Sequence, residues 1–173
     1  MEKETESDYK KYFNPQEYVT QFIGIDKTDE ENSDDAKEVT LLSSLLTDPK
    51  HKGVKEETLL TLKKEKKGEI LLMAIAREKN KTLLPFLIAA CWESEINFSK
   101  YLPFFVLLVL DDDYLVSLEA ITVIEEMPGP FEKQHLAQAI EKIKEGKKSI
   151  TSEKQVLLND LLDTLNAFAQ EIN

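Results

Sequence analysis

The stretch YLPFFVLLVLDDD at residues 101–113 limits the possible folds of this chain, because nine consecutive apolar residues, 102–110, run directly into three aspartates. Such a run fits either a buried strand or a helix that is packed on several sides. Pro103 favours the helix, since the missing N–H of a proline costs nothing in a first helical turn. A membrane span would need about 20 apolar residues. The stretch therefore predicts a buried helix.

Helical signals extend along the rest of the chain. Five glycines and six prolines in 173 residues are few for the many turns that an all-β fold needs. No segment shows the strict apolar–polar alternation of a half-buried strand. The sequence predicts an all-α fold of eight or nine helices, in a soluble chain with 42% apolar and 32% charged residues. The helices are expected at about 14–23, 33–47, 54–67 with Gly68 as its C-cap, 69–79, 82–93, 100–110, 114–127, 131–145 and, after Gly146, up to about 172.

Two parts of unequal size are expected. Residues 1–33 are interpreted as an acidic N-terminal arm, with a short docking helix near 14–23 and a polar linker. Asn14 suits the N-cap of that helix, and Pro15 suits its first position. Residues 34–173 are predicted to form the helical domain, which is long enough to bury a core of its own.

Residues 101–127 resemble a HEAT repeat, the two-helix unit of the armadillo-like α-solenoids. In that family one helix carries Leu-Pro and aliphatic residues, an Asp-containing turn follows, and Val and Ala occupy set positions of the second helix. The resemblance implies a short right-handed α-solenoid, in which stacked helix pairs bury a shared core and display one helix layer to partners. An irregular helical bundle is the alternative. Ser117 departs from the pattern, which often has Arg there; the matching positions are Leu102, Pro103, Leu107, Asp111 or Asp113, Val116 and Ala120.

No motif for catalysis, a cofactor or a metal is recognised in the sequence. There is no phosphate-binding glycine loop, nucleophile elbow or His-Glu-x-x-His pair. His51 and His135 lack patterned partners and are interpreted as surface residues, and Cys91, the one cysteine, as a small core residue. Residues 111–113 lack the ligand spacing of a calcium loop and are expected to cap the next helix. The chain is therefore predicted to be non-enzymatic, with no cofactor and no metal.

Charge suggests where a partner would bind. The formal net charge is −11, and residues 82–132 carry nine acidic side chains and one basic side chain. We expect an acidic stripe to receive a protein partner, possibly a basic one, because complementary charge raises association rate and selectivity. A solvated helix face is the alternative, and Trp92 nearby is interpreted as core rather than as a rim anchor. The candidate partner-binding residues are Glu93, Glu95, Asp112, Glu119 and Glu126.

The leading hypothesis is a non-catalytic protein-interaction module of the HEAT-like kind, located in the cytoplasm because no secretory signal is recognised. One alternative is a small helical enzyme with a pocket between helices, built from residues such as Tyr101, Tyr114 and the acidic cluster. Another is a nucleic-acid-associated protein that uses residues 50–81, with ten basic and five acidic side chains. A sequence pI near 4.8 argues against general nucleic-acid binding. No membrane association is expected.

Overall fold

The computed structural model describes residues 14–23, 34–48, 50, 52–111 and 113–172. Within these residues the protein contains nine α-helices and one short 3-10 helix, and no strand. The predicted all-α class is confirmed, and the number of α-helices agrees with the eight or nine expected. The elements follow in the order α2 (Pro15–Phe22), α3 (Asp34–Thr47), α4 (Lys52–Glu65), α5 (Gly68–Arg77), α6 (Leu84–Glu93), η2 (Ser99–Tyr101), α7 (Leu102–Val109), α8 (Tyr114–Glu125), α9 (Lys133–Lys147) and α10 (Ser152–Ile172).

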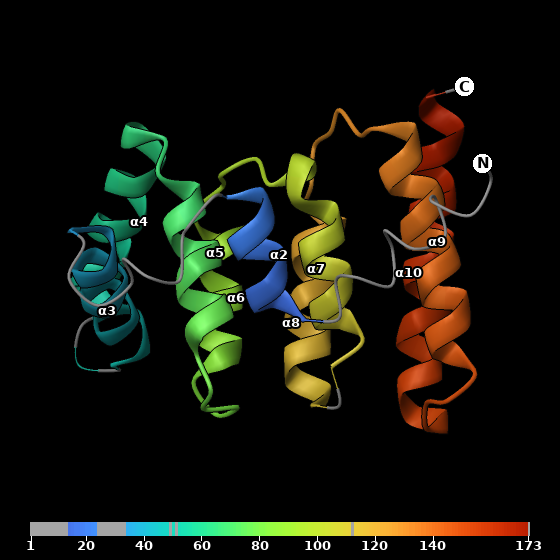
Figure 1. Ribbon diagram of the computed structural model, residues 1–173, viewed down its shortest axis with the longest axis horizontal. Coiled ribbons are helices and arrows are strands. Elements are labelled where there is room, and N and C mark those ends of the chain that lie inside the picture. The colour runs from blue at the N-terminus through green and yellow to red at the C-terminus, as the bar shows by residue number, and fades with distance from the viewer. Residues whose placement is uncertain (1–13, 24–33, 49, 51, 112, 173) are drawn as a thin grey trace.

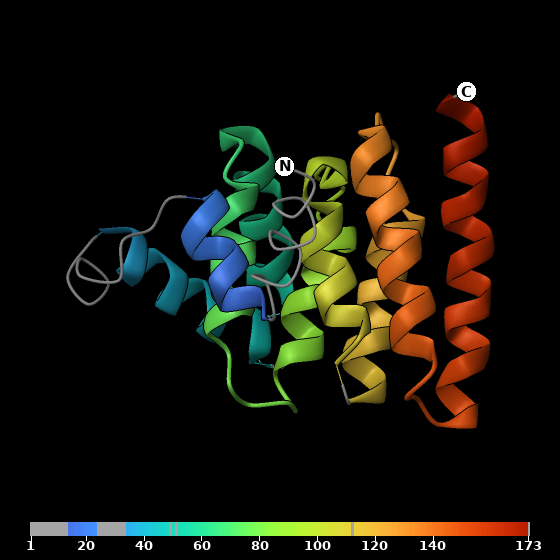
Figure 2. The same cartoon turned by 45° about the vertical axis from the view of Figure 1, so that its right-hand side comes forward.

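From α3 onward, consecutive helices pack as pairs, and the pairs lie side by side in a row. The row runs from α3 and α4 at one end to α9 and α10 at the other (Figures 1 and 2). One layer contains α5, α7 and α9, and the other contains α6, α8 and α10, with α6 and α10 both against α8. Helix α2 lies over the first layer and packs on both α5 and α7 (Figure 1). Membership of the HEAT family stays a prediction.

Helix α7 is the buried centre of this arrangement, as its apolar sequence predicts. Its buried residues are Leu102, Phe104, Phe105, Val106, Leu108 and Val109. Phe104 packs edge-to-face on Phe105, with ring centroids 5.3 Å apart. The ring centroid of Tyr18 in α2 lies 5.6 Å from that of Phe104. Aromatic pairs at these separations add to the stabilisation from area burial. Helix α2 therefore belongs to the hydrophobic core, although most of residues 1–33 lie outside the part of the chain that is described.

Side chains cap the two helices whose starts were predicted from polar residues. Asn14 accepts a hydrogen bond from the backbone N–H of Glu17 at 2.9 Å, at the start of α2. Asp113 accepts from the backbone N–H groups of Leu115 and Val116 at 2.9 and 3.1 Å, at the start of α8. These bonds satisfy donors that have no partner inside the helix. The predicted capping by the aspartate turn is confirmed for Asp113.

The prediction that Gly68 is the C-cap of the preceding helix is wrong. Helix α4 ends at Glu65, and the residue with left-handed backbone is Lys66, with φ of 58°. Gly68 is instead the first residue of α5. A Cβ atom there would lie 3.0 Å from Cγ2 of Ile96 and 3.2 Å from Cε1 of Phe98. The glycine is needed for this close approach, because a side chain would have to displace its neighbours.

Among the helices that the structure describes, none combines the length and the apolar character that crossing a bilayer would require. The longest of them, α10, has an alternating pattern of buried and exposed positions. Its buried residues, which include Leu158, Leu161 and Leu165, recur every three or four positions. That spacing is typical of an amphipathic helix with one face on a protein core. Helix α10 thus covers the end of the row by packing on α9 and α8.

Candidate partner-binding site

Four of the five acidic residues selected from the sequence gather around the C-terminal end of α6. Glu93 is the last residue of α6, and Glu95 follows in the next loop with φ of 54°. Glu119 lies in the middle of α8, and Glu126 directly follows that helix. Asp112 lies outside the described residues. The structure therefore brings together residues of α6 and α8 that are about thirty positions apart in sequence.

Trp92 is at the centre of this group, and the interpretation of Trp92 as a core residue is wrong. The side chain is 39% exposed, and its indole N–H donates a hydrogen bond to Oε2 of Glu119 at 3.0 Å. Leu87, Ile88 and Cys91 take the inward positions of the last turns of α6 and are fully buried. Trp92 follows them at the edge, where the ring packs and its polar nitrogen reaches a partner.

A groove runs between α4 and the end of α6 beside this tryptophan. A hollow of about 590 Å³ is lined by Lys55, Glu56, Leu59, Leu60, Lys63 and residues 92–95. A smaller hollow of about 150 Å³ continues from Trp92 and Glu95 towards Glu126 and Met127. Leu60 is 52% exposed in the larger hollow. We call these two hollows, together with Glu119, the Trp92 groove.

Ion pairs with α4 partly neutralise the acids of the Trp92 groove. Nζ of Lys55 lies 2.5 Å from Oε2 of Glu93, and Nζ of Lys63 lies 2.6 Å from Oε2 of Glu95. The hydrogen bond from Lys63, followed by its charge, lowers the pKa of the Glu95 carboxyl group. The Lys63–Glu95 pair is exposed and contributes little to stability, so a cation from a partner can replace it at small cost, whereas the Lys55 and Glu93 side chains are only 21% and 30% exposed. The predicted acidic stripe is thus a mixed surface with an acidic excess.

Further ion pairs bear on the nucleic-acid alternative. Lys67 contacts Glu38 at 3.1 Å and Glu65 at 3.0 Å, and these hydrogen bonds, with that of Glu65 first, raise the pKa of the lysine. Lys81 forms an ion pair with Asp111. Lysines that contact the chain's own carboxylates are less available to neutralise phosphates. Several basic groups of residues 50–81 therefore serve contacts within the protein.

Negative charge accumulates at the end of α8. Glu125 is exposed, but partial desolvation raises the pKa of its carboxyl group, and the nearby negative charges of Asp160 and Glu126 raise it further. Like charges disfavour the ionised form of each carboxyl group. This part of the surface would therefore gain from a cation supplied by a partner.

The residues suggested for an enzyme pocket are not assembled. The Tyr101 hydroxyl donates a hydrogen bond to Oε1 of Glu69, and burial is the main reason why the pKa of this tyrosine is raised. Tyr114 is exposed at the start of α8 and does not line the cavity that contains Tyr101. Among the described residues, no group of three or more His, Cys, Asp or Glu side chains is placed to hold a metal ion. Cys91 is fully buried, and burial raises the pKa of its thiol, so its interpretation as a core residue is confirmed.

The contribution of α4 to the groove was not predicted from the sequence. Leu59 is buried while Leu60 is exposed, because adjacent residues of a helix point in different directions. The sequence signal for an exposed leucine was therefore present in the Leu59-Leu60 pair. It did not reveal that α4 lies beside Trp92, since that contact joins segments about thirty residues apart.

Comparisons with protein-family models, with curated proteins and with solved structures found no match to this chain. Its function is therefore argued from the geometry and chemistry of its own residues.

Proposed function

We propose that the protein is a non-catalytic protein-interaction module that docks its partner in the Trp92 groove. The observation that carries this proposal is a partly exposed tryptophan beside an exposed leucine, in a groove where glutamates outnumber lysines. Tryptophan is enriched among residues that dominate binding energy at protein interfaces. The resemblance to HEAT repeats supports the same function, because such stacks present one helix layer to partners. The proposal retains the cytoplasmic location expected from the sequence.

The chemistry of the groove indicates what kind of partner fits. Among the described residues, five glutamates and two lysines border the groove, which gives these residues a net charge of −3. The acids are Glu56, Glu93, Glu95, Glu119 and Glu126. A suitable partner segment presents an apolar side chain to Trp92 and Leu60, with Lys or Arg on either side of it. The apolar contact supplies affinity, and the charges supply orientation and association rate.

The proposal is tested with the full-length protein as bait in a native extract. A first variant, Trp92→Ala, removes the anchor, and a second, Glu119→Lys with Glu126→Lys, reverses charge at the groove. The matched controls are Leu115→Ala, at an exposed apolar position of α8, and Glu141→Lys with Asp163→Lys, at exposed positions of α9 and α10. We expect a partner that the wild type and both controls retain and both groove variants lose.

Affinity for that purified partner then measures the anchor directly. Loss of a central tryptophan should weaken binding at least about thirtyfold, as for other interface hot spots. Circular dichroism confirms that each variant is folded. Equal retention of every partner by the groove variants and the controls would exclude the Trp92 groove as the docking site.

A further inference from the structure

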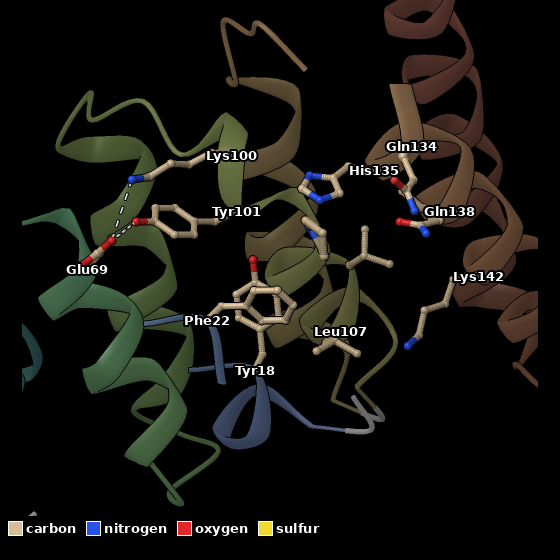
Figure 3. Close-up of a pocket in the computed structure, with 13 residues that line it drawn as sticks. Tyr18, Phe22, Glu69, Lys100, Tyr101, Leu107, Gln134, His135, Gln138 and Lys142 are labelled. Atoms are coloured by element: carbon tan, nitrogen blue, oxygen red, sulfur yellow. Dashed lines mark hydrogen bonds and ion pairs between the residues drawn. The ribbon is translucent and has the colours of Figure 1, made fainter. Parts of the chain in front are cut away.

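The cavity that contains Tyr101 lies on the other helix layer, apart from the Trp92 groove. It is a cavity of about 600 Å³ between α2, α7 and α9, with α5 at one end (Figure 3). Cavities of 300 to 1,000 Å³ are the usual size of small-molecule sites. The chemistry of its walls is divided, with apolar groups on one side and hydrogen-bond donors on the other.

The apolar side comes from α2 and α7. Tyr18 and Phe22 stack with ring centroids 4.6 Å apart, and Phe22 is 56% exposed. Pro103, Val106 and Leu107 of α7 continue this surface. Together they form a flat aromatic wall and an aliphatic floor, which suit an apolar body of a ligand.

The donor side comes from a single helix, α9. Gln134, Gln138 and Lys142 recur every four residues and so lie along one stripe, about 12 Å long at 1.5 Å per residue. Figure 3 shows these side chains one after another along α9, with Tyr18 and Phe22 across the cavity. Burial lowers the pKa of the Lys142 amine, and the nearby Glu145 opposes that shift. A partly desolvated cation attracts an anion more strongly than one in bulk water.

His135, next to this stripe, has a buried ring nitrogen, Nδ1. Its side chain is about a quarter exposed, yet Nδ1 is buried and has no hydrogen-bond partner among the described residues. Nε2 of the same ring lies 3.6 Å from the Glu132 carboxylate. Buried polar atoms are nearly always satisfied in native proteins, so a water or a ligand group beside this wall of the cavity would complete the hydrogen bonding of the ring.

Among the described residues that line the cavity, Glu69 is the acidic one, and it has partners of its own. Glu69 accepts the hydrogen bond from Tyr101, and Nζ of Lys100 lies 3.8 Å from its carboxylate and 4.7 Å from the centre of the Tyr101 ring. The described residues of the lining include two lysines and this one glutamate, which gives them a net charge of +1 in a chain of net charge −11. The cavity is thus a locally cationic site, which an anionic ligand would favour.

We propose that the cavity between α2, α7 and α9 binds a small organic carboxylate with an apolar body. The carboxylate lies against Gln134, Gln138 and Lys142, and the apolar body lies on Tyr18, Phe22 and Leu107. Charge-assisted hydrogen bonds from an ammonium group and amides to a carboxylate are stronger than neutral ones, which gives the site its selectivity. This site is independent of the Trp92 groove, so either proposal stands without the other.

The test uses the full-length protein labelled with ¹⁵N and four ligands. Decanoate and 4-phenylbutyrate carry the carboxylate on an alkyl or an aromatic body, while decan-1-ol and decylammonium have a neutral or a cationic head. We expect both carboxylates to shift amide resonances of α2 and α9. The alcohol should bind about tenfold more weakly than decanoate, and decylammonium more weakly still. The stronger of the two carboxylates identifies the kind of apolar body that the site prefers.

Variants locate the site. Lys142→Met should weaken decanoate binding about tenfold, whereas Lys144→Met, at an exposed position of the same helix, should leave it unchanged. Phe22→Ala should weaken binding about threefold, compared with Phe86→Ala at a similarly exposed position of α6. If Lys142→Met fails to fold, Gln138→Leu replaces it, with the exposed Gln170→Leu as its control.

Several results would overturn the proposal. The first is no resonance shift with either carboxylate up to millimolar concentration. The second is equal affinity for the acid, the alcohol and the amine, which would show that the donor stripe plays no part. The third is equal binding by the Lys142 and Lys144 variants, or shifts that map to helices other than α2, α7 and α9.

Discussion

The hydroxyl group of Ser117 in α8 donates a hydrogen bond to the backbone carbonyl oxygen of Val109, the last residue of α7, at 2.8 Å. The same hydroxyl oxygen lies 3.2 and 3.1 Å from the carbonyl oxygens of Asp111 and Asp113, and the side chain is fully buried. One serine thus holds the turn that joins the two central helices. These contacts give a physical reason for a small polar residue at position 117.

Replacing this serine should destabilise the protein. In Ser117→Ala the buried carbonyl group of Val109 loses its side-chain donor, and we expect the free energy of unfolding to fall by about 1 to 2 kcal/mol. Urea denaturation followed by circular dichroism measures the change. Ser44→Ala, at an exposed position of α3, is the control and should change stability by less than about 0.5 kcal/mol. Equal effects of the two substitutions would contradict the role assigned to Ser117.

Two glycines in helices should respond in opposite ways to a larger side chain. A Cβ atom at Gly53 in α4 would meet nothing within 4 Å, whereas one at Gly68 would crowd Ile96 and Phe98. Gly53→Ala should therefore stabilise the protein by about 0.5 kcal/mol through helix propensity. Gly68→Val should destabilise it by about 1 to 3 kcal/mol through overpacking. Thermal and urea unfolding of both variants provide the check, and a Gly68→Val protein as stable as the wild type would contradict the close approach.

Glu125 should make stability depend on pH in a particular direction. Its pKa is raised in the folded protein above the ordinary value of 4.5 by partial desolvation and by the charges of Asp160 and Glu126. The ionised carboxylate therefore costs folding free energy at neutral pH, and the cost disappears as pH falls through the folded and then the unfolded pKa. Glu125→Gln should be more stable than the wild type at pH 7, by about a few tenths of a kcal/mol after solvent screening. The difference should vanish near pH 4.

A matched variant separates this effect from a general change of charge. Glu141→Gln removes the same charge from an exposed position of α9. Its stability should follow that of the wild type across the same pH range. A Glu125→Gln protein less stable than the wild type at pH 7 would contradict the predicted direction.

The thiol of Cys91 should report on unfolding. It is fully buried in α6, and burial raises its pKa, so the reactive thiolate is scarce in the folded protein. A disulfide reagent such as dithionitrobenzoate should modify one thiol per chain rapidly in denaturant and hardly at all in native buffer. Under native conditions the slow rate should track the unfolding equilibrium measured by urea titration. Rapid labelling of the native protein would contradict the buried position.

The helices could be predicted because their signals are local. Pro103 at the start of an apolar run and Asp113 before α8 act within one helical turn, so the sequence alone locates both. The role of Gly68 could not be predicted correctly because two different constraints favour a glycine. One is a left-handed backbone at the end of a helix, and the other is the close approach of a neighbouring side chain. Only the position of Ile96, far along the chain, distinguishes between them.

The sites were less predictable because each depends on segments distant in sequence. Lys63 and Glu95 are 32 residues apart, and their contact turns an apparent acidic patch into a mixed surface. The stripe of Gln134, Gln138 and Lys142 follows from helix geometry, but the aromatic wall opposite it comes from α2, more than one hundred residues earlier. Packing of helices, rather than any local pattern, creates the Trp92 groove and the cavity between α2, α7 and α9.

The position of Trp92 has a practical consequence. It is the one tryptophan of the chain, so the indole fluorescence of the whole protein originates beside Glu119 at the rim between α4 and α6. An unlabelled sample therefore carries its own optical reporter at the surface proposed for docking. A bound segment that covers the ring would move the emission to shorter wavelengths, whereas a carboxylate held between α2 and α9 would leave the spectrum unchanged.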